Sequence, residues 1–250
     1  MTAQHRKVCW VTGASSGIGL AVAEALVRDG HFVIVSARGE QGLADALEYL
    51  HKVGPSAVAV AVDVTSSQQV ENAVSHIEEQ YGKINVLVAN AGMNVGARGW
   101  EELSVADFDR VTQINLNGVY YTISAVLPTM RAQQDGLVVN ISSWAGRYVS
   151  AKPGPAYSAA KAAVVALTTS LNASEFHNGI RACAICPAEV ATPAMMRRKV
   201  APSAAALKKM LRPQDIAAAV RFVVNMPSHV CVNELLISPV WNGAYGAAQL

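Results

Sequence analysis

The chain is poor in charge and has no long hydrophobic run. Of its 250 residues only 15% are charged, and 20 basic side chains against 18 acidic ones leave a formal net charge of +2. Such a balance gives no general attraction to polyanions, so we expect neither a nucleic-acid partner nor a membrane. No run approaches the ~18 apolar residues that span a bilayer, and no apolar signal region opens the sequence, which predicts a cytoplasmic location.

Cysteine is also scarce. The four cysteines, at positions 9, 183, 186 and 231, are too few for a disulfide framework. Cys183 and Cys186 form a C-x-x-C pair, but further ligands at suitable spacing are missing, and the six histidines are scattered along the chain. We therefore expect no metal site, and we expect this pair to pack in the core as small apolar side chains.

What the sequence does contain is a regular alternation of short apolar runs and longer stretches of helical period. The runs cover residues 8–11, 33–35, 58–62, 86–88, 137–141, 180–185 and 235–237. The intervening helices are predicted over 17–28, 42–52, 67–81, 108–130, 156–176 and 213–225. Continuously apolar strands are typical of a parallel sheet with both faces covered. The pattern predicts an α/β fold, a doubly wound seven-stranded parallel sheet in one domain over residues 1–250.

A glycine-rich turn follows the first predicted strand and leads into a helix. It reads Thr12-Gly13-Ala14-Ser15-Ser16-Gly17-Ile18-Gly19. Glycines keep such a turn tight and let backbone amides approach a pyrophosphate at the positive end of the helix. The position predicts dinucleotide binding in a Rossmann fold. The spacing differs from the common G-x-G-x-x-G, and a glycine turn without a ligand is the alternative.

The end of the second predicted strand bears on which dinucleotide is bound. A carboxylate there would accept hydrogen bonds from an unphosphorylated ribose, but the sequence has Ala37 and Arg38. A guanidinium pairs well with a phosphate, and a charge-assisted contact of about 1.5 to 3 kcal/mol favours NADP over NAD by roughly ten- to a hundredfold. The alternative is that Arg38 is an ordinary solvated loop residue.

Serine, tyrosine and lysine side chains near the fifth predicted strand point to proton transfer. Ser142 and Ser143 end that strand, and Tyr157 and Lys161 stand at i and i+4, on one face of the next helix. A neighbouring ammonium stabilises a phenolate and brings the tyrosine pKa down from its usual value near ~10. Such a phenol can exchange a proton with an alcohol oxygen, which the Ser143 hydroxyl holds.

Taken together, these motifs resemble the short-chain dehydrogenase/reductase family over essentially the whole chain. They are Thr12 to Gly19, Asp63-Val64, Asn90-Ala91-Gly92, Asn115 in Asn115-Leu116-Asn117-Gly118, Ser143, Tyr157-x-x-x-Lys161 and Pro187 to Thr192. The resemblance implies an NADP(H)-dependent oxidoreductase that interconverts a small alcohol and its carbonyl compound. It also implies a homotetramer (or homodimer) joined through the helices at 108–130 and 156–176.

The resemblance assigns roles residue by residue. Tyr157 is the acid/base, Ser143 positions the carbonyl, Lys161 also binds the nicotinamide ribose, and Asn115 holds a proton-relay water. The residues implied in cofactor binding are Gly13, Ser15, Ser16, Gly17, Ile18, Gly19, Arg38, Asp63, Val64, Asn90, Ala91, Gly92, Tyr157, Lys161, Pro187, Val190 and Thr192.

The chain departs from the family pattern at three places. The loop from Trp144 to Pro155 is one residue longer than usual, so either Ser142 or Ser143 could face the substrate, and we favour Ser143. Ala188 replaces the usual glycine after Pro187, and Ala89 replaces the first asparagine of Asn-Asn-Ala-Gly. None of these changes removes a reacting group.

Substrate identity stays open at this point. We expect specificity from residues 93–100, 144–154 and a lid at about 189–211. Arg147, Lys152 or the run Arg197-Arg198-Lys199 could recognise an anionic substrate, although such cations usually face solvent. Two other functions remain as alternatives: a catalytically silent NADPH-sensing protein, which the intact Asn115, Ser143, Tyr157 and Lys161 argue against, and a sugar-nucleotide epimerase or dehydratase, which normally has a larger C-terminal region.

Overall fold

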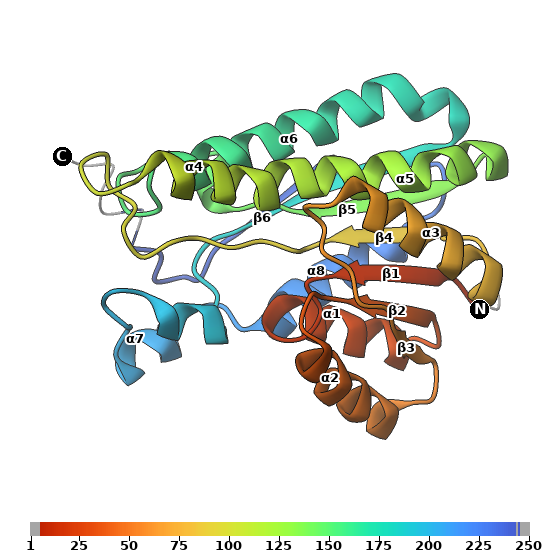
Figure 1. Cartoon of the computed structure of the whole chain (residues 1–250), viewed down its shortest axis with the longest axis horizontal. Helices are drawn as coiled ribbons and strands as arrows, with labels where there is room; N and C mark the ends of the chain where they lie inside the picture. Colours follow the sequence, from red (N-terminus) through yellow and green to blue (C-terminus); the bar gives the residue numbers. More distant parts are fainter. Residues whose placement is uncertain (1–5, 244, 246–250) are drawn as a thin grey trace.

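A computed structural model describes residues 6–243 and 245, and it contains one seven-stranded parallel sheet. The strands are β1 (Val8–Thr12), β2 (Phe32–Ser36), β3 (Ala57–Ala59), β4 (Val86–Ala89), β5 (Gly136–Ile141), β6 (Ile180–Pro187) and β7 (Glu234–Ile237). Their order across the sheet is β3-β2-β1-β4-β5-β6-β7, so the direction of winding reverses between β1 and β4 (Figure 1). The predicted fold class is confirmed: this is a doubly wound, Rossmann-like α/β fold.

Helices cover both faces of the sheet (Figure 1). One face carries α1 (Gly17–Arg28), α2 (Glu40–Val53) and α8 (Pro213–Val224); the other carries α3 (Ser67–Tyr81), α4 (Val105–Thr112), α5 (Gly118–Gln133) and α6 (Pro155–Glu175). Each face has its own apolar core, one centred on residues such as Val11, Val22 and Val220, the other on Trp10, Ile77 and Val126. Burial on both faces explains why the strands are apolar throughout rather than alternating.

Strand β6 is buried on both faces and contains the C-x-x-C pair. All eight of its residues are buried. Cys183 packs in the cluster on the α1/α8 face, whereas Cys186 packs with Val165 and Ala184, because residues three apart in a strand point to opposite faces. Both thiols are fully buried on opposite faces of the sheet, as expected for core packing. The described residues include no group of three His, Cys, Asp or Glu placed to hold a metal ion.

Two predicted elements need correction. The third strand, predicted over 58–62, is ladder-paired only over Ala57–Ala59, since at this edge of the sheet Val60 and Val62 make single amide bonds to β2 and the loop after it. The helix predicted over 108–130 is three elements, because a π-helical turn (Gln113–Asn117) separates α4 from α5. In that turn the Asn115 side chain donates to the Val111 carbonyl, which in an α-helix would accept from the backbone amide of Asn115.

The remaining pieces lie outside the sheet layers. Short 3₁₀ turns occupy Trp144–Gly146, Phe176–Asn178 and Pro193–Arg197, and α7 (Ala204–Lys209) follows the last of them. In Figure 1, α7 projects away from the sheet. Among the residues that the structure describes, no helix is long and apolar enough to cross a membrane.

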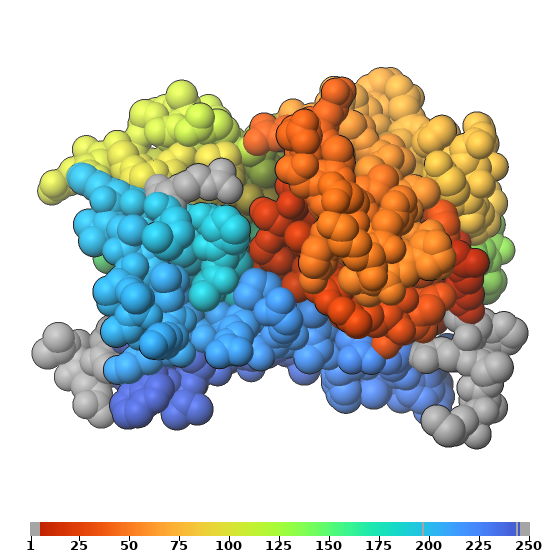
Figure 2. Space-filling model, turned by 90° about the horizontal axis from the view of Figure 1, so that it is seen from below, coloured from red at the N-terminus to blue at the C-terminus, as the bar shows by residue number. Residues whose placement is uncertain are grey.

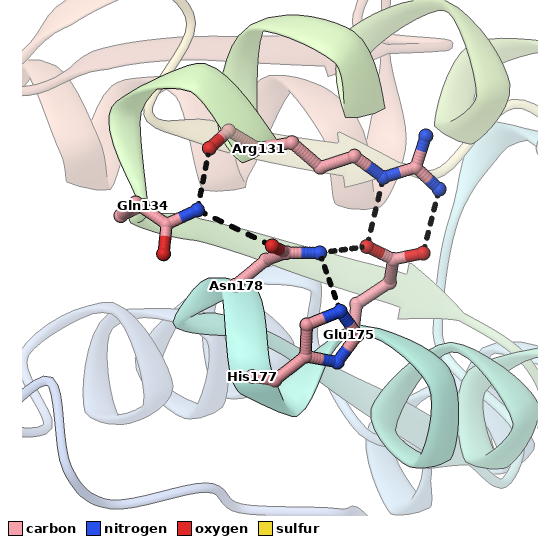
Figure 3. A network of polar contacts seen from close by, with 5 residues as sticks. All are labelled: Arg131, Gln134, Glu175, His177 and Asn178. Atoms are coloured by element: carbon pink, nitrogen blue, oxygen red, sulfur yellow. Dashed lines mark hydrogen bonds and ion pairs between the residues drawn. The ribbon is translucent and has the colours of Figure 1, made fainter.

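A polar network joins the ends of α5 and α6 (Figure 3). The Arg131 guanidinium donates two hydrogen bonds to the Glu175 carboxylate, at 2.9 and 2.6 Å, and Asn178 adds a third at 2.9 Å. The Glu175 side chain is buried, with 9% of its surface exposed. The Arg131 hydrogen bonds hold the pKa of Glu175 down to about 2. The network ties the two longest helices of this face together.

We predict that Glu175→Gln lowers the free energy of unfolding by about 1–2 kcal/mol at pH 7, because it replaces a charge-assisted bidentate pair whose arginine is partly screened by solvent. Since the pKa is depressed, this stabilisation is full above about pH 4.5 and is lost as the pH falls toward 2. Urea unfolding at pH 7 and pH 3 checks this. The exposed pair of α2 provides the control: Glu48→Gln should change stability by less than about 0.5 kcal/mol, and an equal effect of both variants would contradict the prediction.

Candidate active site

A large cavity of about 1760 Å³ opens at the carboxyl ends of the strands, around the point where winding reverses. It brings together nearly all residues that the sequence singled out, from regions that lie far apart in the chain. Those that line it are Gly13, Ser15, Ser16, Gly17, Ile18, Arg38, Asp63, Val64, Asn90, Ala91, Gly92, Asn115, Ser143, Tyr157, Lys161, Pro187, Val190 and Thr192. Gly19 is the exception, and it does not line the cavity.

The turn after β1 is shaped by close backbone approach. Gly13 has φ +63°, and a Cβ there would lie 2.8 Å from the Ala91 Cα. A Cβ on Gly19 would lie 2.5 Å from the Gly13 carbonyl oxygen, so Gly19 serves packing rather than the cavity. The Asn90 amide donates to the carbonyls of Thr12 and Gly13 at 2.9 and 3.1 Å, which fixes the turn to the end of β4. Free amides at the start of α1 are thus presented to the cavity, where an anionic group can bind.

Arg38 lies at the outer end of this cavity, with 64% of its side chain exposed. The sequence suggested that no acid stands near it, but the structure places the Asp63 carboxylate 4.0 Å from the Arg38 Nη1. Asp63 also accepts hydrogen bonds from the amide and hydroxyl of Thr65, at 3.0 and 2.8 Å. An exposed ion pair of this length contributes little, so the Arg38 guanidinium remains able to pair with an anionic group.

The two serines at the end of β5 have different surroundings. The Ser142 hydroxyl is buried and donates to the backbone carbonyl of Lys161 at 2.7 Å, so it serves the packing of α6 on the sheet. The Ser143 hydroxyl lies beside the Tyr157 phenol and lines the cavity. This arrangement supports the choice of Ser143, despite the longer loop that follows it.

Tyr157 and Lys161 lie close together inside the cavity wall. The Lys161 ammonium sits 5.8 Å from the centre of the Tyr157 ring and donates to the Ile141 carbonyl at 2.8 Å. Only 3% of Lys161 is exposed, and burial lowers its pKa to about 8. The ammonium is therefore held by β5 and lies over the ring face.

The expected lowering of the tyrosine pKa is not what this arrangement gives. Burial raises the pKa of Tyr157, and this outweighs three effects that lower it: the Ser143 hydroxyl, the charge of Arg198 and the charge of Arg98. Lys161 is not among these effects, because burial lowers its pKa to about 8, so its side chain is already neutral at the higher pH where the phenol ionises. The cations that favour the phenolate in this cavity come instead from two loops.

Asn115 holds the loop after β4 against the π-helical turn. Its amide donates to the carbonyls of Met93 and Val111, both at 2.8 Å, and its own carbonyl accepts from the Met93 amide at 3.2 Å. A Cβ on Gly92 would lie 2.7 Å from the Asn115 Oδ1. Asn115 is fully buried and lines the cavity next to Lys161, yet most of its hydrogen bonds go to the backbone. A role for it in holding water stays a prediction.

Two of the segments that we expected to determine specificity are held by contacts of their own. The predicted lid is closed at its base by a bridge between Val190 and Leu211, in which Ala191 donates to the Leu211 carbonyl at 2.7 Å. In Figure 2 it lies, in cyan and light blue, beside the red and orange N-terminal part of the chain. In the loop after β5, Trp144 stacks on Tyr148 with ring centres 4.7 Å apart, so this loop provides an aromatic wall of the cavity.

Most cations that the sequence offered for an anionic substrate are neutralised by acids. Arg147 pairs with Glu234 at 2.9 Å, and Lys199 pairs with Glu102 at 3.0 Å. Glu189 accepts both Lys152, at 2.8 Å, and Arg198, at 2.7 Å. The side chain of Arg197 lies outside the described residues.

The sequence did not single out Arg98, which lines the cavity and acts electrostatically on Tyr157. One signal for it was available. Arg98 is the single charged residue in the segment 93–100, where we expected specificity determinants.

Comparison with known proteins places this geometry in context. Residues 7–202 match the family model described as short chain dehydrogenase. An uncharacterized oxidoreductase of Staphylococcus saprophyticus is 37% identical over 94% of this chain and 97% of its own length. An alcohol dehydrogenase from the archaeon Thermococcus sibiricus, complexed with 5-hydroxy-NADP, is 30% identical with a TM-score of 0.84, covering 95% of this chain and 98% of its own. The closed form of a serine dehydrogenase complexed with NADP+ is 29% identical with a TM-score of 0.85, covering 93% and 95%.

We predict that Tyr157 ionises above the pH at which exposed tyrosines do, and that Ser143→Ala raises its pKa further, because the hydroxyl that favours the phenolate is removed. Ultraviolet titration of the wild type against Tyr157→Phe isolates this phenol. Ser142→Ala is the matched control, because that hydroxyl is directed to the Lys161 carbonyl. An unchanged midpoint in Ser143→Ala would show that the two hydroxyls do not interact.

Proposed function

Because the chain belongs to the short-chain dehydrogenase family, we propose that it is an NADP(H)-dependent enzyme that interconverts a small alcohol and its ketone or aldehyde. One observation carries this proposal. Ser143, Tyr157 and Lys161 converge in the same cavity that begins at the glycine-rich turn, so a ligand bound to the turn extends toward the phenol. The NADP forms bound to the alcohol dehydrogenase and the serine dehydrogenase named above agree with it.

The residues present fit such a dinucleotide. The backbone at Gly13 and Gly17 has positive φ angles of 63° and 59° and leaves room where a side chain would intrude. The turn and the start of α1 suit a pyrophosphate, Arg38 suits the additional phosphate of NADP, and Asp63 and Val64 line the adenosine end. Lys161, Pro187, Val190 and Thr192 line the same cavity and would hold the nicotinamide and its ribose.

A bound NADP(H) would supply the hydride chemistry, as acceptor in oxidation and donor in reduction. The chain's own residues handle the proton. In reduction the protonated phenol of Tyr157 donates its proton to the carbonyl oxygen, which the Ser143 hydroxyl holds; in oxidation the phenolate form of Tyr157 takes the hydroxyl proton of the alcohol. Lys161 keeps a positive charge beside the ring, and its pKa of about 8 leaves it mostly protonated at neutral pH.

The proposed proton transfer makes a direct prediction for Tyr157. Tyr157→Phe removes only the hydroxyl, so kcat should fall by at least about a thousandfold, while the Kd for NADPH should change by less than about threefold. Turnover is followed by nicotinamide absorbance with a panel of aldehydes, ketones, hydroxy acids and polyols, and NADPH affinity by calorimetry. Turnover that survived in Tyr157→Phe would remove this residue from the mechanism, and a wild type that binds NADPH but turns over nothing would favour a sensor.

Arg38 leads to a second prediction, about cofactor choice. The wild type should bind NADPH about tenfold more tightly than NADH, since Arg38 favours the phosphate while Asp63 opposes it. The pair Ala37→Asp with Arg38→Leu should reverse this preference, because the new carboxylate accepts hydrogen bonds from an unphosphorylated ribose. Fluorescence titration of both cofactors gives the ratio. Tighter binding of NADH by the wild type would contradict this role of Arg38.

A further inference from the structure

Arg98 is held in the cavity by the packing of two loops. Its backbone lies against Gly154, which has φ +81°, and a Cβ on Gly154 would lie 2.2 Å from the Arg98 carbonyl oxygen. The Asn94 side chain donates to the Pro153 carbonyl at 2.8 Å, which joins the same two loops. The Arg98 side chain is half-buried and lines the cavity. It is therefore positioned by structure rather than left to extend freely into solvent.

Arg98 is also the guanidinium at this end of the cavity that lacks an acidic partner among the described residues, whereas the Lys161 ammonium is directed to the Ile141 carbonyl. Its cationic neighbours in the wall, Arg147, Lys152 and Arg198, are each paired with Glu189 or Glu234. No hydrogen bond or ion pair joins the Arg98 guanidinium to any residue that the structure describes. Partial burial and the nearby charge of Arg198 both lower the pKa of Arg98, so its charge is held at a cost. A positive charge kept in this way favours binding of an anion.

An anion on Arg98 would lie near the Tyr157 phenol, in the same cavity. Arg98 and Arg198 both act on the Tyr157 phenol, and Glu189 already neutralises Arg198. A guanidinium without an acidic partner can balance one negative charge. Its planar N–H groups can donate two parallel hydrogen bonds to a carboxylate. A substrate whose alcohol oxygen contacts Tyr157 can thus place a carboxylate on Arg98 only if the two groups are a few bonds apart.

We propose that the substrate is a short hydroxy acid, or the corresponding oxo acid in the reverse direction, whose carboxylate binds Arg98. This rests on the proposed function, because it identifies the substrate class of the same site. The carboxylate is unchanged by the reaction: the carbinol loses a hydride to NADP+ and a proton to the phenolate form of Tyr157, and the products are the oxo acid, NADPH and the neutral phenol. Arg98 is thus a specificity-determining residue.

Pairs of substrates with the same carbon skeleton test this proposal. We compare 2- and 3-hydroxybutyrate with their uncharged amides as substrates for the NADP+-loaded protein. The wild type should show a kcat/KM at least about tenfold higher for the acids. In Arg98→Gln that preference should disappear, mainly through a KM for the acids raised about ten- to a hundredfold, while the amides change by less than about threefold. Arg98→Lys should retain part of the preference, because it keeps the charge but not the fork.

Arg110→Gln is the matched control, since it removes the same charge from an exposed pair on α4, outside the cavity. It should leave the acid preference intact. Loss of the preference in Arg147→Gln but not in Arg98→Gln would overturn the assignment to Arg98. Equal turnover of acids and amides by the wild type would overturn the hydroxy-acid proposal while leaving the oxidoreductase in place.

A binding measurement separates this inference from the proposed function. Calorimetry follows pyruvate and acetoacetate as they bind to the NADP+-loaded protein, where no hydride can be transferred to them. Weakening by at least about tenfold in Arg98→Gln supports the carboxylate site, even in a protein that turns over no substrate. Binding that is absent in the wild type, or equal in both proteins, overturns it.

Discussion

Burial of a phenol and an ammonium side by side, at the end of β5, is the constraint that the rest of the site serves. Both groups lose hydration, which raises the pKa of Tyr157 and lowers that of Lys161 to about 8. The fold offsets part of this cost with specific partners. The Ile141 carbonyl accepts from Lys161 at 2.8 Å, and the Ser143 hydroxyl favours the charged form of the phenol.

The same constraint gives the surrounding loops an electrostatic role. Because Lys161 loses its proton at a lower pH than Tyr157, the cations that act on the ionising phenol are Arg98 and Arg198, on the segments after β4 and β6. Glu189 then decides which of them is free, since it pairs with Arg198 and with Lys152. Proton transfer and substrate selection thus depend on one set of charges, which links the proposed mechanism to the proposed class of substrate.

Much of this architecture follows from local sequence. Continuous apolar runs predict the strands because both sheet faces are covered, and strand ends meet at one edge, so motifs far apart in the chain converge. Local sequence does not show which hydrogen-bond or ion-pair partner a polar side chain takes in the folded chain. In the π-helical turn the Asn115 side chain, not its backbone amide, donates to the Val111 carbonyl. Asp63 lies 25 residues after Arg38 in the sequence, and only folding brings the two side chains together. Gly19 looks like a ligand residue in the motif, but its contact with Gly13 assigns it to packing.

The substrate end was the least predictable part, because its charges are paired across loops. Arg147 and Lys152 looked available in the sequence, yet each has an acid within 3 Å, contributed by β7 and by the segment after β6. The sequence indicates the segment that contains Arg98 but not Arg98 itself, because its lack of an acidic partner is a property of the folded chain. The predicted homotetramer stays a prediction: Phe108 and Tyr120 are exposed on α4 and α5, the helices expected to meet symmetry mates.

A crystal structure of the protein with NADP+ tests the central claim most directly. Our account predicts the pyrophosphate on the turn at Gly13 and the nicotinamide ring facing the Tyr157 hydroxyl. A dinucleotide bound elsewhere, or a Tyr157 hydroxyl turned away from that ring, would contradict it.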